Sequence, residues 1–169
     1  MKKTLIISTF PTCGKTYLFE NQMNYGYSIL DIESSLFRRG DGWEIEYIDF
    51  IDNRIGKVDY ILVSQHDEVL KELNLRKLPF ITVLPNNSSS LSDRERQIIK
   101  QQWFGRFLLR NNSHIKNINE WLDRLLINYE GWTNIDHIMT FQPILNISLN
   151  ADEYLSDKID DIHVWYNNL

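Results

Sequence analysis

The sequence predicts an α/β fold in one domain, residues 1–169, with a five-stranded parallel sheet flanked by helices in three layers. Three observations support this prediction. Short apolar runs alternate with helical patterns along the whole chain. Each run is apolar on both faces, as expected for parallel strands buried between two helix layers. A length of 169 residues suits a single domain with a well-buried core.

The predicted strands are the short apolar runs. They cover Lys3–Ser8, Tyr27–Ile32, Tyr60–Ser64, Phe80–Leu84 and Ile144–Leu149. In a doubly wound sheet of this kind, ligands bind in the crevice at the carboxyl ends of the strands. Functional residues are therefore expected directly after each strand.

The segments between the strands have helical spacing of their apolar residues. Thr16–Met23 has no helix breaker, and a last helix is expected from about Ala151 towards Trp165. Ser92 can cap a long helix from Asp93 to about Arg110, with Glu95 completing a capping box. The other helical stripes are Trp43, Tyr47, Phe50, Ile51 and Ile55; Val69, Leu70 and Leu73; and Ile118, Trp121, Leu122, Leu125 and Leu126.

A phosphate-binding loop is predicted directly after the first strand. The segment from Ser8 to Thr16 reads STFPTCGKT and follows the pattern G-x-x-x-x-G-K-[ST], with Thr9 in place of the first glycine. In such loops backbone N–H groups cradle phosphate oxygens, the lysine reaches the terminal phosphates and the threonine hydroxyl binds Mg²⁺. The expected nucleotide-binding residues are Pro11, Thr12, Cys13, Gly14, Lys15, Thr16 and Tyr17.

Two threonines stand where loops of this kind usually carry glycine. Thr9 and Thr12 would be strained at a backbone φ above zero. Either the loop uses other dihedral angles at these positions, or its phosphate binding is impaired. An ordinary β–α turn without a ligand is the alternative interpretation.

Polar side chains after the second and third strands are candidates for the acceptor site. Asp31 and Glu33 follow the second strand two residues apart, so that one can hold Mg²⁺ while the other positions an acceptor hydroxyl. Arg38 and Arg39 can clamp an anionic group of the acceptor. His66 follows the third strand, which lacks the acidic residue that many phosphate-loop enzymes place there. A helix cap and solvated arginines are the structural alternatives.

The long helix from Asp93 carries a local basic surplus. Arg106 and Arg110 are four residues apart and share one face. Helical lids that close over nucleotide phosphates use arginines in this way, because the transferred phosphoryl oxygens need compensating charge. A solvated amphipathic helix is the alternative.

Composition narrows the function further. The net charge of −5 argues against a protein that binds duplex nucleic acid. No apolar stretch approaches the length of a membrane span, and no secretory signal is expected after Met1. The single Cys13 excludes an internal disulfide and a cysteine-based zinc site. These features predict a protein of the reducing cytoplasm.

The chain resembles the small P-loop kinases of the nucleoside-monophosphate and shikimate kinase type, in particular phage-encoded nucleoside-monophosphate-kinase-like proteins. The resemblance covers nearly the whole chain. It rests on Phe10 to Thr16, Leu30 to Phe37, Val58 to His66, Trp103 to Arg106 with Arg110, and Asn150 to Leu155.

This resemblance implies a P-loop NTPase fold with a helical lid at residues 91–111, with ATP as donor and Mg²⁺ as cofactor. It also implies an acceptor held between the end of the second strand and the lid. By the same resemblance, Lys15 and Thr16 handle phosphates and metal, Asp31 contacts Mg²⁺ or the acceptor, and Arg106 and Arg110 are lid arginines. A phage-encoded protein would act in the host cytoplasm.

The predicted function is ATP-dependent phosphoryl transfer to a small acceptor, first of all a (deoxy)nucleoside monophosphate. Two alternatives stay open. A nucleotide-binding or phage–host interaction protein without catalysis is favoured by Thr9 and Thr12. A nucleic-acid end kinase needs a basic groove, which the acidic balance disfavours. Lys15, Asp31, Arg106 and Arg110 are the predicted catalytic residues.

Overall fold

The computed structural model describes residues 2–37, 40–111 and 118–169, without the side chains of residues 110–111, 118–119 and 121. Its strands are β1 (Leu5–Thr9), β2 (Ile29–Asp31), β3 (Tyr60–Ser64), β4 (Phe80–Pro85) and β5 (Leu145–Leu149). They form one sheet in the order β2-β3-β1-β4-β5, and every neighbouring pair is parallel. The predicted five-stranded parallel sheet is confirmed.

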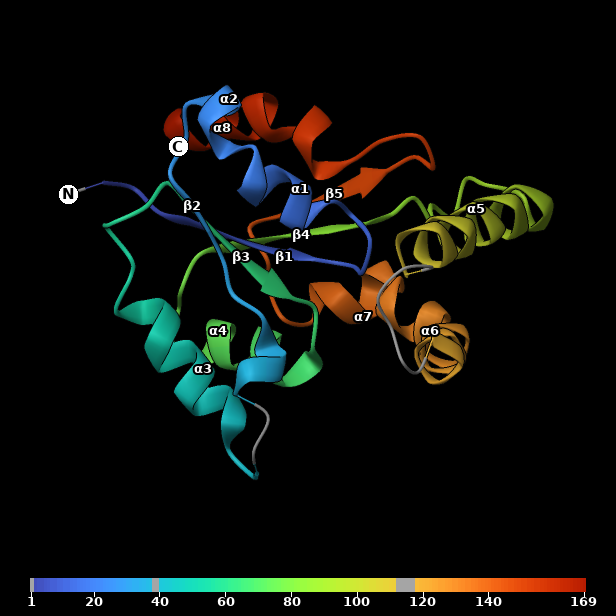
Figure 1. Cartoon of the computed structure of the whole chain (residues 1–169), viewed down its shortest axis with the longest axis horizontal. Coiled ribbons are helices and arrows are strands. Elements are labelled where there is room, and N and C mark those ends of the chain that lie inside the picture. The colour runs from blue at the N-terminus through green and yellow to red at the C-terminus, as the bar shows by residue number, and fades with distance from the viewer. Residues whose placement is uncertain (1, 38–39, 112–117) are drawn as a thin grey trace.

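Helices cover both faces of the sheet (Figure 1). Along one face lie α1 (Lys15–Glu20), α2 (Gln22–Tyr25) and α8 (Ile159–Asn167), and along the other lie α3 (Trp43–Asp52), α4 (Asp67–Leu75) and α7 (Ile135–Met139). Both faces are therefore shielded from water. This explains why every residue of β1 and β4 is buried, and why buried and exposed residues do not alternate along these strands.

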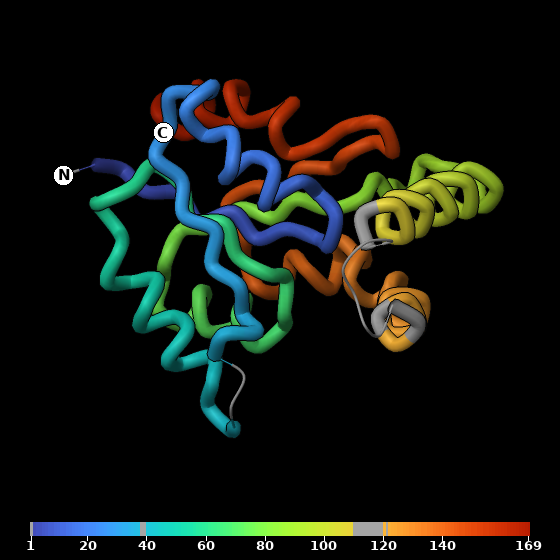
Figure 2. The backbone as a smooth tube through the Cα atoms, in the orientation of Figure 1, coloured from blue at the N-terminus to red at the C-terminus, as the bar shows by residue number. Residues whose placement is uncertain are grey.

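Two long helices, α5 (Asp93–Asn111) and α6 (Ile118–Trp132), lie beyond the carboxyl ends of the strands. The backbone trace shows them side by side, away from the amino end of the sheet (Figure 2). The predicted capping box of α5 is present, because the Ser92 backbone N–H donates to the Glu95 carboxylate and the Glu95 N–H donates to the Ser92 hydroxyl. The α5 helix fills most of the predicted lid segment.

Two helix predictions differ from the structure. The helix predicted for Thr16–Met23 is broken at Asn21, whose side-chain amide donates to the Tyr17 carbonyl oxygen and so competes with the helical ladder. The helix predicted from Ala151 begins only at Ile159. Before it lies the short 3₁₀ helix η2 (Leu155–Asp157), whose amino end is capped by a capping box of Tyr154 and Asp157.

Two further boundaries differ. The helix that starts at Trp43 ends at Asp52, so Ile55 lies beyond it in a turn. The second strand is shorter than predicted, because the Ser28 backbone N–H donates to the Asp59 side chain and not to a neighbouring strand. The short α7 was not predicted; it is capped by the Asn134 side chain, which accepts from the His137 N–H.

An aromatic cluster joins the helix pair to the sheet. Phe10, the first residue after β1, is only 1% exposed. Its ring makes edge-to-face contacts with Trp103 of α5 and with Tyr129 and Trp132 of α6, at centroid distances of 5.9, 5.6 and 6.4 Å. Such pairs stabilise beyond the area they bury. The start of the predicted phosphate-binding loop is thus fixed against α5 and α6.

Candidate active site

The predicted phosphate-binding loop forms a tight turn between β1 and α1. The Cys13 N–H donates to the Phe10 carbonyl oxygen at 3.3 Å, and Leu18 continues the helix with a bond to Gly14. Gly14 has a φ of +94°, in the region that favours glycine. The carboxyl end of β1 lies in the middle of the sheet, between β3 and β4. The loop therefore occupies the position where parallel α/β sheets bind ligands.

The two threonines of the loop differ in their backbone. Thr9 is an ordinary strand residue, paired with Ser64 of β3 and Val83 of β4. Thr12 has a φ of +67°, which costs a non-glycine residue about 1–2 kcal/mol. The loop thus keeps a left-handed residue at position 12 despite the missing glycine, and Thr9 needs no special backbone angle.

The loop lysine and the acid after β2 form an ion pair. The Lys15 Nζ atom lies 3.0 Å from the Asp31 Oδ1 atom, and the two side chains are only 16% and 9% exposed. The sequence separates these residues by one helix and one strand. The structure brings them together because β2 and β1 flank β3 and end at the same edge of the sheet. Thr16 follows Lys15 in the first turn of α1.

The other predicted loop residues have different surroundings. The Cys13 thiol is buried and donates to the Val83 carbonyl oxygen at 3.6 Å, and burial raises the pKa of this thiol. Its side chain therefore packs under the loop. Tyr17 is 56% exposed on α1, and Pro11 lies in the turn itself.

The predicted acceptor residues lie at the ends of β2 and β3. Glu33 is exposed and precedes the short 3₁₀ helix η1 (Ser34–Leu36). His66 caps α4, its Nε2 atom lies 3.1 Å from the Ser34 hydroxyl, and its ring meets Trp43 edge-on. The structure thus links His66 to the segment after β2. Arg38 and Arg39 lie outside the described residues.

Arg106 is held between two aromatic rings. Its guanidinium carbon lies 4.5 Å from the Trp103 ring centroid and 4.1 Å from the Tyr154 ring centroid. Its Nη1 atom donates to the Glu153 carbonyl oxygen at 2.7 Å. Arg106 therefore ties α5 to the segment after β5. Arg110 belongs to the same helix, and its side chain is outside the described part.

Tyr154 also covers the predicted phosphate-binding loop. A Cβ atom added to Gly14 would lie 3.2 Å from the Tyr154 Cδ1 atom. The next residue, Leu155, donates its N–H to the Cys13 carbonyl oxygen at 2.8 Å. The loop, Tyr154 and Arg106 thus form one stack. The 150–155 segment is part of the family resemblance, but its contact with the loop was not predicted, because no spacing rule links residues about 140 positions apart.

The described residues contain no cluster of three His, Cys, Asp or Glu side chains able to hold a metal ion. In the same part of the chain, no helix is long and apolar enough to cross a membrane.

The chain is similar to solved structures of small kinases. No protein-family model and no curated protein sequence matches it. Shikimate kinase from Bacteroides thetaiotaomicron aligns over 98% of both chains, with a TM-score of 0.53 and 14% identity. Shikimate kinase from Acinetobacter baumannii, in complex with shikimate, aligns over 100% of this chain and 96% of that one, with the same TM-score and identity. A gluconokinase from Sinorhizobium meliloti 1021 aligns over 94% of this chain and 88% of that one, with a TM-score of 0.52 and 12% identity.

The chain has the small P-loop kinase fold. The likeness spans nearly its whole length, and the five parallel strands with flanking helices agree with it. At 12–14% identity the likeness is one of fold.

Proposed function

We propose that this chain is an ATP-dependent kinase that transfers the γ-phosphoryl group to a small acceptor. The ion pair between Lys15 and Asp31 carries the proposal. It places a cation of the phosphate-binding loop beside a carboxylate at the end of β2. Phosphoryl transfer needs both groups, one to bind the donor phosphates and one to position the acceptor.

The two groups can exchange partners when nucleotide binds. Phosphate oxygens offer the Lys15 ammonium a stronger partner than one carboxylate, because they carry more charge. Lysine is a flexible point charge and can reorient towards them. Asp31 is then free to accept a hydrogen bond from an acceptor hydroxyl or to hold Mg²⁺. The proposed resting pair therefore keeps both groups in place without a ligand.

The loop residues fit a Mg²⁺-nucleotide. Gly14 takes the left-handed backbone that lets loop N–H groups face a phosphate, and Thr16 places a hydroxyl beside Lys15 in sequence. Thr16 and Asp31 would hold the Mg²⁺, whose chemistry is to neutralise phosphate charge. Lys15 would bind the terminal phosphates. Tyr154 and Arg106 would limit where the rest of the nucleotide can lie, because Tyr154 covers the loop and Arg106 stacks on Tyr154.

The acceptor in this proposal is a small molecule with a hydroxyl or phosphate group. The nucleoside monophosphate predicted from the sequence is the first candidate. Shikimate and gluconate are rival candidates, because solved structures of similar fold are named for them. Asp31 and Glu33 supply carboxylate hydrogen-bond acceptors, and the His66 ring can donate or accept a hydrogen bond. A panel of these acceptors distinguishes the candidates.

The decisive experiment compares Lys15→Met with the native chain in an ATP-consuming assay with that acceptor panel. We expect kcat/KM to fall about 10²–10³-fold, as when one preorganised charge is lost from a transition state. Lys71→Met, an exposed lysine on α4, is the matched control and should retain full activity. Equal turnover in Lys15→Met and the native chain would contradict the assignment.

A nucleotide-binding protein without catalysis is the second candidate. The left-handed Thr12 favours it, because the loop carries strain where active loops carry glycine. This candidate predicts that ATP binds and that Lys15→Met abolishes binding, while no acceptor in the panel is phosphorylated. The nucleic-acid end kinase has less support. On α5, Arg96 and Lys100 pair with acids and Arg106 stacks between rings, so these cations do not form an open basic groove.

A further inference from the structure

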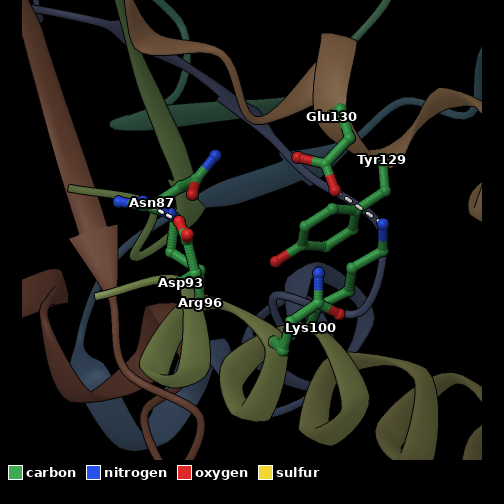
Figure 3. Close-up of a pocket in the computed structure, with 7 residues that line it drawn as sticks. Asn87, Asp93, Arg96, Lys100, Tyr129 and Glu130 are labelled. Carbon is green, nitrogen blue, oxygen red and sulfur yellow. Dashed lines mark hydrogen bonds and ion pairs between the residues drawn. The ribbon is translucent and has the colours of Figure 1, made fainter. Parts of the chain in front are cut away.

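A polar cavity of about 230 Å³ lies between α5, α6 and the segment after β4. Figure 3 shows its lining, which includes Arg96 and Lys100 from α5, Tyr129 from α6 and Asn87 from the segment after β4. No residue of the phosphate-binding loop lines the cavity, although Tyr129 also packs against Phe10 at the start of that loop. The volume of the cavity suits a compact polar molecule more than a nucleotide.

Contacts within the protein hold the two cations of the cavity in place. The Arg96 Nη1 atom donates to backbone carbonyl oxygens of Ser88 and Leu91, which fixes the guanidinium. The Lys100 ammonium lies 5.1 Å from the Tyr129 ring centroid and 5.9 Å from that of Phe104. These contacts position both charges at the cavity wall before any ligand arrives.

In each of these two ion pairs, the acidic side chain is more exposed than the cation. Lys100 is 19% exposed and its partner Glu130 is 65% exposed, at an Nζ–Oε1 distance of 2.6 Å. Arg96 is 34% exposed and its partner Asp93 is 97% exposed. Exposed carboxylates form weak ion pairs because water and salt compete for them. Another anion can therefore displace these carboxylates from the two cations with little loss of free energy.

Tyr129 adds a hydroxyl hydrogen-bond donor to the cavity wall. The residue as a whole is 3% exposed. Figure 3 shows the hydroxyl pointing away from Glu130, towards the space beside Asn87 and Arg96. Burial raises the pKa of Tyr129, so the hydroxyl stays protonated and can only be matched by an acceptor or a water molecule.

We propose that this cavity binds a small oxyanion, such as inorganic phosphate or a compact carboxylate. In this site Lys100 and Arg96 bind the oxyanion oxygens, the Tyr129 hydroxyl donates a third hydrogen bond, and the carboxylates of Glu130 and Asp93 swing out to water. Charge-assisted bonds from three donors on two helices then replace two weak surface ion pairs. The inference does not depend on the proposed kinase activity.

The test is a titration of the Lys15→Ala variant, in which binding at the phosphate-binding loop is weakened, at constant ionic strength. Sodium phosphate is added in one arm and succinate in the other, and the side-chain amide signals of Asn87 and Gln97 are followed by ¹⁵N–¹H NMR. We expect saturable shifts of both amides. A larger effect of phosphate identifies a phosphate site, and a larger effect of succinate identifies a carboxylate site.

Three further changes, each made in the Lys15→Ala background, make the test specific. Glu130→Gln removes the competing carboxylate and should tighten binding about tenfold, whereas Lys100→Met should weaken it at least tenfold. Tyr129→Phe should weaken binding about threefold. Arg124→Gln, which removes an exposed cation of α6 paired with Glu120, is the control and should leave binding unchanged.

Equal oxyanion affinity in the Glu130→Gln and Lys100→Met forms would overturn the proposal. So would shifts no larger than those caused by sodium chloride at the same ionic strength. If Lys100→Met does not fold, the comparison of Glu130→Gln with its Lys15→Ala parent decides alone. Because all arms carry Lys15→Ala, a failed kinase assay leaves this result unaffected.

Discussion

At the scale of single residues, two glycines occupy opposite situations. Gly14 is left-handed, and an added Cβ atom would press on the Tyr154 ring at 3.2 Å. Gly105 lies inside α5, and nothing lies within 4 Å of an added Cβ atom. One glycine is thus required by geometry, whereas the other only weakens a helix.

We therefore expect opposite signs for the same substitution at the two positions. Gly14→Ala should lower the free energy of unfolding by about 1–3 kcal/mol, because a positive φ and a tight contact act together. Gly105→Ala should raise it by about 0.5–1 kcal/mol through helix propensity. Urea unfolding of both variants measures the difference. A stabilised Gly14→Ala variant would show that the loop does not hold the left-handed backbone.

At the scale of elements, Asp59 joins the starts of β2 and β3. Its carboxylate accepts from the backbone N–H and the hydroxyl of Ser28, both at 2.7 Å, and pairs with Lys2 at 2.8 Å. Partial burial raises the pKa of Asp59, but the hydrogen bonds from Lys2 and Ser28 outweigh it and lower the pKa below 3.8. This acid is structural and lies at the amino end of β3.

A lowered pKa in the folded state links Asp59 to acid stability. The stabilisation is present above the pKa of the unfolded state and is lost as the pH falls through the lower folded pKa, so the window lies below about pH 4. Asp59→Asn should lower the free energy of unfolding by about 1–2 kcal/mol at pH 7. In this variant the free energy of unfolding should also fall less steeply with decreasing pH below about pH 4. Asp52→Asn, an exposed change on α3, is the control. Parallel acid profiles of Asp59→Asn and the native chain would contradict this role.

The elements also show where sequence reasoning succeeds. Apolar runs predict the strands, because a parallel sheet covered on both faces requires them, and β3 begins and ends as predicted. The break at Asn21 was missed, because a side-chain bond to a nearby carbonyl competes with helix periodicity. In the candidate site, the Gly-Lys-Thr pattern identifies the loop. The stack of Arg106 on Tyr154 depends on tertiary contacts that no local pattern encodes.

At the scale of the whole molecule, Phe10 joins the sheet to the α5–α6 pair. Three rings from those helices surround its buried side chain. Phe10→Ala would leave a cavity at this joint and should lower the unfolding free energy by about 3–5 kcal/mol. Leu109→Ala removes a side chain that is 79% exposed on α5, and it should change stability by less than about 0.5 kcal/mol. Chemical unfolding measures both changes.

A loss of less than about 1 kcal/mol in Phe10→Ala would mean that the helix pair does not depend on this joint. Nucleotide affinity gives a second measurement, because Phe10 also begins the phosphate-binding loop. A weakened ATP affinity, with α5 and α6 still helical by circular dichroism, would locate the effect in the loop.

The central place of β1 has a consequence for folding. β1 is made first, yet its two neighbours are β3 and β4, whose paired residues lie 55 and 74 positions further along the chain. During synthesis at the ribosome, β1 therefore emerges long before either neighbour. Its apolar residues Leu5, Ile6 and Ile7 must stay unpaired until β3 and β4 have been made. Long-range pairing of this kind slows folding and exposes aggregation-prone segments, so the growing chain depends on its later strands to shield its first one.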